Sequence, residues 1–292
     1  MEKYRLLREA VAAAELVPPV SIAAPEPATD EQILAVHDRD YLERVETGRL
    51  TTSEVRRIGF PWSPALVRRA RCSVGGTISA CRAALRDGVA VNLAGGTHHA
   101  FRGHGEGYCI FNDSLIAIRA MQREGRIERA VILDGDVHQG NGSAAIAAAD
   151  PTIFTLSVHA ERNFPRIKEN SDLDVGLPDG TGDGTYLEAW ESSVRRSLGL
   201  GLSRDQARAD LAIYLAGADP YEDDRLGRLA LSKAGLARRD RRTFELCGEA
   251  GVPVATVMAG GYARRVEDTV SIHLQTVRLA LEHVWEGHPG GA

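Results

Sequence analysis

The chain has 292 residues, 43% of them hydrophobic, and a formal net charge of −5. This length can bury a full core and permits one large domain or two small ones; we expect a single domain over residues 1–292. Basic residues are scattered among acidic ones, which argues against a nucleic-acid partner, and no stretch approaches the roughly 20 apolar residues of a membrane span.

The cysteines suggest a reducing compartment. A chain this long does not need disulfides to fold, and its cysteines form no CxxC pair. We therefore expect a cytoplasmic protein with four reduced, buried thiols: Cys72, Cys81, Cys109 and Cys247.

Short apolar runs alternate with stretches whose apolar residues recur every three to four positions. Such alternation is typical of a parallel sheet with helices on both faces. We predict an α/β fold with three layers, α/β/α, around a mainly parallel sheet. The expected strands are Val89 to Leu93, Ala130 to Leu133, Ile153 to Val158, Leu211 to Leu215 and Val252 to Met258, and the expected helices are Ser114 to Glu124, Gly184 to Leu198 and Arg238 to Ala250.

Two segments are predicted to be irregular. Pro18 to Pro27 contains four prolines, which indicates an extended connection on the surface. Asn163 to Asp183 is rich in turn-forming residues and is predicted to be one long loop, and loops of that length are usually functional.

Each expected strand is followed by glycine or by side chains that can bind a metal. In an open parallel sheet, ligands bind at the carboxyl ends of the strands. We therefore expect these five segments to converge on one edge of the sheet: Gly95 to His99, Asp134 to His138, Ser157 to His159, Gly217 to Asp219 and Gly260 to Tyr262.

The second of these segments predicts a metal site. Alternate residues of a strand share a face, so Asp134, Asp136 and His138 are expected to point the same way. A catalytic zinc takes three protein ligands and leaves a place for water, and Asp219 is the best third ligand. The alternative is that Asp219, which precedes Pro220, is only a turn residue.

Nearby side chains could supply acid–base chemistry. A histidine of the His98-His99 pair suits a general base because its ordinary pKa lies near neutrality, and Asp134 could orient one of the two rings. Tyr262 offers a hydroxyl donor; alternatively, it is a tyrosine of the core boundary.

Together, these motifs resemble those of the histone deacetylase family of metal-dependent amidohydrolases, which has the arginase/deacetylase fold. The resemblance is closest to class IV and related bacterial members. The resemblance runs through most of the chain. Its five motifs occur in the family's order: Gly96 to His99, Gly107 to Asp113, Asp134 to Gly142, Gly217 to Asp219 and Gly260 to Tyr262.

The resemblance implies a role for each site residue. One zinc, or Fe²⁺ in the cell, would bind Asp136, His138 and Asp219, and His99 would act as general base and then acid. His98 would be an electrostatic partner oriented by Asp134, and Tyr262 would donate to the oxyanion.

The resemblance also implies the surroundings of the site. Tyr108 and Phe164 would form the apolar walls of a tunnel for an acylated lysine or a small acylated amine. A structural potassium would bind backbone carbonyls of residues 134–138 and a serine such as Ser157.

Two departures from the family pattern stand out. Where class I members have an aspartate beside the second histidine, this chain has Asn141, as class IV members do, so we expect a lower pKa for His99. Met1 to Tyr4 resembles an internal family segment, so we expect the family's first strand to be missing, through a misassigned start codon.

Three other functions remain as alternatives. An arginase-like enzyme with two manganese ions would need further aspartates where Gly140 stands. A NAD-binding oxidoreductase would use the loose glycine fingerprint Gly140 to Ala145 with Glu161, but leaves the Asp and His residues unexplained. The third is a catalytically silent module that binds acyl-amines. Substrate identity, acyl length and oligomeric state stay open.

Overall fold

A computed structural model describes residues 2–16, 21–200 and 208–283. Its centre is one sheet of six strands in the order β1-β6-β5-β2-β3-β4, with every neighbouring pair parallel. The predicted parallel sheet is confirmed. The strands are β1 (Val89–Asn92), β2 (Ala130–Asp134), β3 (Ile153–Ala160), β4 (Leu173–Leu177), β5 (Leu211–Leu215) and β6 (Val254–Val257).

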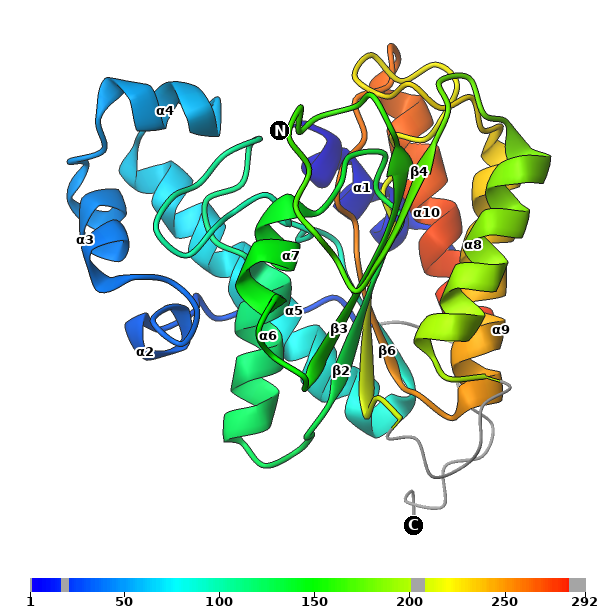
Figure 1. The fold of residues 1–292 in the computed structure, drawn as a ribbon, viewed down its shortest axis with the longest axis horizontal. Coiled ribbons are helices and arrows are strands. Elements are labelled where there is room, and N and C mark those ends of the chain that lie inside the picture. The colour runs from blue at the N-terminus through cyan, green and yellow to red at the C-terminus, as the bar shows by residue number, and fades with distance from the viewer. Residues whose placement is uncertain (1, 17–20, 201–207, 284–292) are drawn as a thin grey trace.

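Helices cover both faces of the sheet, as predicted (Figure 1). On one face lie α5 (Pro64–Asp87), α6 (Asp113–Arg123) and α7 (Asn141–Ala147), and on the other lie α8 (Asp183–Ser197), α9 (Lys233–Ala250) and α10 (Val266–Glu282). Helix α1 (Glu2–Ala13) packs against α10. The remaining helices, which lie beyond α5 and α6 in Figure 1, are α2 (Asp30–Ile33), α3 (Arg39–Thr47) and α4 (Thr52–Ile58).

The two faces of β2 bury side chains in two different cores. Ile132 belongs to the core beneath α5 and α6, whereas Val131 and Leu133 belong to the core beneath α8 and α9. Because successive side chains of a strand point to opposite faces, a strand covered on both sides must be apolar throughout. This explains why β2 and β5 are continuous apolar runs in the sequence.

The predicted loop from Asn163 to Asp183 is wrong in its centre, where β4 lies. Among the described strands, β4 pairs with β3 alone, and it is half-exposed, with Asp174 and Gly176 among its five residues. An edge strand with one exposed face carries no continuous apolar run, so its sequence reads as a loop.

Other boundaries also differ from those predicted. Helix α9 begins at Lys233, five positions before the expected Arg238, because Ser232 caps it by accepting from the backbone N–H of Gly235. Residues 21–27 of the predicted connection contain no helix or strand, while 18–20 lie outside the described residues.

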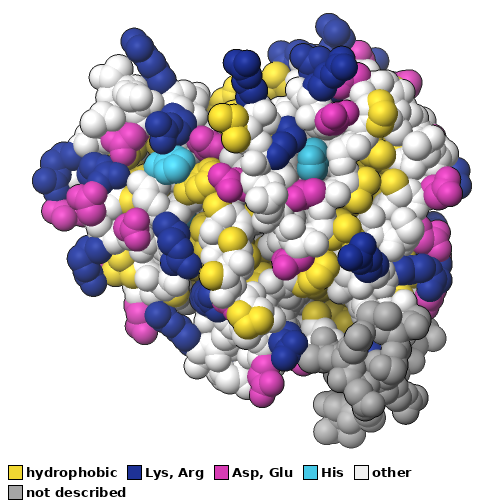
Figure 2. Space-filling view, in the orientation of Figure 1, with side chains coloured by type: hydrophobic (Ala, Val, Ile, Leu, Met, Phe, Trp, Pro, Cys, Tyr) yellow, Lys and Arg dark blue, Asp and Glu magenta, His cyan; other side chains and the backbone are white. Residues whose placement is uncertain are grey.

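All four cysteines are free, as expected, although Cys72 is only half-buried. On the face drawn in Figure 2, basic and acidic side chains are interspersed. Within the described ranges, no helix is long and apolar enough to cross a membrane.

Candidate active site

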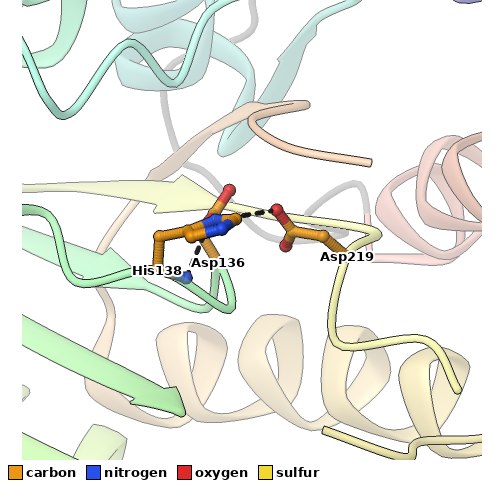
Figure 3. A group of neighbouring side chains, drawn as sticks. All are labelled: Asp136, His138 and Asp219. Carbon is orange, nitrogen blue, oxygen red and sulfur yellow. Dashed lines mark hydrogen bonds and ion pairs between the residues drawn. The ribbon is translucent and has the colours of Figure 1, made fainter. Parts of the chain in front are cut away.

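Asp136, His138 and Asp219 converge at the ends of the adjacent strands β2 and β5 (Figure 3). His138 Nδ1 lies 2.9 Å from Asp136 Oδ1 and 3.3 Å from Asp219 Oδ2. One potential ligand atom from each residue lies within 4.8 Å of the others, and in the described part of the chain this is the one such group. The structure thus brings these three residues together, and Asp219, although it lies in a turn, is fully buried.

The reason expected for this convergence was wrong in part. Strand β2 ends at Asp134, so strand alternation does not place Asp136 and His138. Hydrogen bonds within a turn do so instead. The N–H of Asp136 donates to Asp134 Oδ1 at 3.1 Å, and the N–H of His138 donates to Asp136 Oδ1 at 2.9 Å.

The surroundings of Asp219 fit a bound cation. Its Oδ2 is buried, and among the described residues its polar neighbour is His138 Nδ1 at 3.3 Å, a contact that does not meet hydrogen-bond geometry, although buried polar atoms are normally satisfied. Burial, together with the charge of Asp136, raises the pKa of Asp219 to about 7. A divalent ion would neutralise these carboxylates, and an oxygen–nitrogen–oxygen donor set suits zinc.

Gly260 gives the two carboxylates the room they need. Its N–H donates to Asp136 Oδ2 at 2.8 Å. A Cβ at this position would lie 1.8 Å from Asp219 Oδ2 and 2.6 Å from Asp136 Oδ2. Only glycine permits this approach of the backbone to both side chains.

The two adjacent histidines have opposite electrostatic surroundings. His98 Nδ1 lies 2.6 Å from Asp134 Oδ2, as expected. Burial lowers the pKa of His98, but the charges of Asp134 and Asp136 outweigh it and raise the value to about 9. His99 Nδ1 instead faces Asn141 Oδ1 at 2.7 Å, and burial lowers its pKa well below the ordinary range. Since a base must be neutral to accept a proton, His99 is the better base of the pair.

Tyr262 and two exposed aromatic residues surround the approach to His99. Phe164 lies edge-on to the His99 ring, with 4.9 Å between the ring centroids. The ring centroids of Tyr108 and Tyr262 are 5.7 Å apart. Burial raises the pKa of Tyr262, so its hydroxyl stays protonated and can donate. A hollow of about 470 Å³, lined by residues 161–166, lies beside Phe164.

Three further polar residues, which no motif in the sequence marks, support this site. Lys3 of α1 is buried and donates to the carbonyl oxygens of Ala259 and Gly261 at 3.3 and 3.2 Å. Arg239 of α9 is fully buried behind the turns that carry the three clustered residues. Glu106 accepts from Asn141 Nδ2 at 2.6 Å. For Glu106 the only sequence signal was an acidic residue between glycines just before Tyr108.

The glycines of the loose dinucleotide fingerprint pack against the histidine loop. A Cβ on Gly140 would lie 2.4 Å from Asp134 Oδ2, and one on Gly142 would lie 2.4 Å from the carbonyl oxygen of Ala100. These glycines are needed for packing inside the site. The structure therefore does not favour the NAD-binding alternative.

A family model described as the histone deacetylase domain matches residues 1–277. The chain belongs to the histone deacetylase family. This is a family of hydrolases, and the chain is 28% identical to the histone deacetylase-like amidohydrolase of Pseudomonas aeruginosa, covering 90% of this chain and 71% of that protein.

Two other relatives are more similar. An uncharacterised protein of Picosynechococcus sp. is 44% identical, over 96% of this chain and 91% of its own length. Histone deacetylase 2 of Arabidopsis thaliana is 30% identical, over 86% of this chain and 66% of its own length.

Solved structures of the family share the fold. The HD domain of HDA15 has a TM-score of 0.79 at 22% identity and covers 96% of this chain and 83% of that one. An HDAC homologue complexed with SAHA has a TM-score of 0.77 at 22% identity and covers 95% and 77%. The arginase/deacetylase-like α/β fold expected from the motifs is confirmed.

Proposed function

We propose that this protein is a zinc-dependent amidohydrolase that removes an acetyl or other acyl group from an acylated lysine or a related amine. The observation that carries the proposal is the buried group of Asp136, His138 and Asp219, in which Asp219 Oδ2 makes no geometrically sound hydrogen bond, near the neutral base His99. The rings of His99 and His138 lie edge to face, with 5.9 Å between their centroids. Fe²⁺ is the alternative ion at the same ligands.

The ion would bind Asp136, His138 and Asp219, and when bound it supplies Lewis-acid polarisation of a water and of the amide carbonyl. His99 then accepts the proton of the attacking water at Nε2 and passes it to the departing amine. The Tyr262 hydroxyl donates to the developing oxyanion. His98, charged through its contact with Asp134, contributes positive potential beside the reacting atoms.

The substrate arm is proposed to enter between Tyr108 and Phe164, which are 43% and 42% exposed. Two aromatic walls suit the slim alkyl chain of an acylated lysine or polyamine. A solved relative complexed with SAHA supports binding of a small ligand by this fold. A structural potassium is proposed beside Ser157, which is the register partner of Asp134 on the neighbouring strand.

The test is a panel of acyl-lysine peptides and acetylated polyamines, assayed with zinc, with Fe²⁺ and after chelation. We expect amide hydrolysis that chelation abolishes and metal restores. Asp219→Asn should lose metal and turnover together, whereas Asp223→Asn, whose side chain is 42% exposed in an ion pair with Arg264, should keep both. Metal binding with no hydrolysis of any panel member would favour a silent binding module instead.

A further inference from the structure

The side chain of Asn141 lies between His99 and Glu106 and hydrogen-bonds to both. His99 Nδ1 is 2.7 Å from Asn141 Oδ1, and Asn141 Nδ2 is 2.6 Å from Glu106 Oε1. His99 and Asn141 are 4% and 3% exposed, and the Glu106 side chain is 17% exposed. A carboxylate is therefore linked to the proposed base through one intervening amide.

The direction of these hydrogen bonds follows from the chemistry of the last group. An ionised carboxylate only accepts, so the Asn141 NH₂ must face Glu106 and its carbonyl oxygen must face His99. An amide oxygen also only accepts, so Nδ1 of His99 must carry the proton. In the neutral ring, the lone pair is then on Nε2, which is the nitrogen that a base needs.

With the amide turned over, the result would reverse. The Asn141 NH₂ would donate to His99 Nδ1, and the neutral ring would then carry its proton on Nε2, where it could not accept another. An asparagine alone does not choose between these two arrangements, because its two ends are nearly the same size. The choice must come from the group on its far side.

Glu106 is held in place by the turn that also presents Tyr108. The N–H of Cys109 donates to the carbonyl oxygen of Glu106 at 2.8 Å, and the N–H of Gly107 donates to that of Arg57 at 3.1 Å. Gly107 has φ +54°, and a Cβ there would lie 2.5 Å from His99 Cδ2. The turn that holds Glu106 therefore packs directly on the His99 ring.

We propose that Glu106 is a positioning residue that fixes the Asn141 amide and thereby keeps His99 in the tautomer with a free Nε2. This inference rests on the proposed function for its catalytic meaning, but the tautomer itself does not.

The decisive measurement is the tautomer of His99, read from ¹⁵N chemical shifts of histidine-labelled protein and assigned with a His99→Gln variant. We expect the protein to show Nδ1–H alone. Glu106→Gln is nearly isosteric, but its amide can donate as well as accept, so we expect a mixture of tautomers. Retention of Nδ1–H alone in Glu106→Gln would overturn the proposal, whether or not the protein hydrolyses any amide.

Kinetics provide a second readout. Glu106→Gln should lower kcat on the order of 10-fold, which is less than the roughly 100-fold to 10,000-fold that a general base contributes, because part of the tautomer mixture keeps a free Nε2. KM, metal content and the unfolding midpoint should be unchanged. The exchanged pair Asn141→Asp with Glu106→Gln restores an acceptor-only group, and it should recover the single tautomer and most of kcat. Glu188→Gln, on the exposed face of α8, is the matched control. An exchanged pair that leaves the tautomers mixed would also count against the proposal.

Discussion

Replacing Arg239 by methionine should destabilise the protein by removing a buried cation from behind the active site. Arg239 Nη1 donates to the carbonyl oxygens of Gly135 at 3.0 Å and Gly217 at 2.8 Å. Its Nε and Nη2 donate to Asp240 Oδ1 at 3.0 and 2.9 Å. Both glycines lie in the turns that carry Asp136, His138 and Asp219, so the guanidinium joins these turns.

The expected loss can be estimated from these contacts. Removing one partner of a buried ion pair destabilises by about 3–5 kcal/mol. Asp240 keeps the hydroxyl donors of Tyr214 and Thr276, both at 2.5 Å, so we take the lower end, about 3 kcal/mol. The two carbonyl oxygens add roughly 1 kcal/mol or slightly less each. The sum of about 4–5 kcal/mol corresponds to a fall in Tm of roughly 10 °C or more.

Urea unfolding of the metal-free protein, followed by circular dichroism, measures this loss. Arg242→Met is the matched control: it lies on the same helix, but its side chain is 26% exposed in a surface network of glutamates, where ion pairs contribute about 0–1 kcal/mol. Adding Asp240→Asn to Arg239→Met should recover about 1–2 kcal/mol by removing the unpaired charge. A loss below about 1 kcal/mol for Arg239→Met would refute this reasoning.

Three further outcomes are expected. Tyr262→Phe should keep its metal but lose roughly 100-fold to 1000-fold in kcat, as when an oxyanion donor is removed. Metal analysis together with steady-state kinetics measures both quantities. Full turnover in this variant would exclude Tyr262 from the mechanism. Gly260→Ala should weaken metal binding strongly, because its Cβ would lie 1.8 Å from Asp219 Oδ2. Competition with a chromophoric zinc chelator measures the metal affinity, and an unchanged affinity would contradict the prediction. Burial lowers the pKa of His37 from 6.5 to about 4, so the unfolded chain binds more protons between these values and stability falls as the pH drops through this window. Between pH 7 and pH 5, the free energy of unfolding of the unmodified protein should fall by about 2 kcal/mol more than that of His37→Gln. Equal falls in the two proteins would argue against His37 as the source.

Much of the fold could be predicted where burial leaves a local pattern. Strands β2 and β5 are buried on both faces, so their sequences are apolar throughout. The half-exposed edge strand β4 has no such pattern and was predicted as a loop. The start of α9 was missed because it depends on the Ser232 cap rather than on apolar spacing.

By itself, the sequence determined that aspartate, histidine and tyrosine side chains gather at one edge of the sheet, because residues at the carboxyl ends of parallel strands share that edge. Tertiary structure alone decided which group contacts which. Asp219 accepts from the N–H of Val137, 82 positions away, and Glu106 accepts from Asn141, 35 positions away. A hydrogen bond between distant segments imposes no periodicity on either segment, so only the packed chain reveals that a carboxylate stands behind the amide of Asn141.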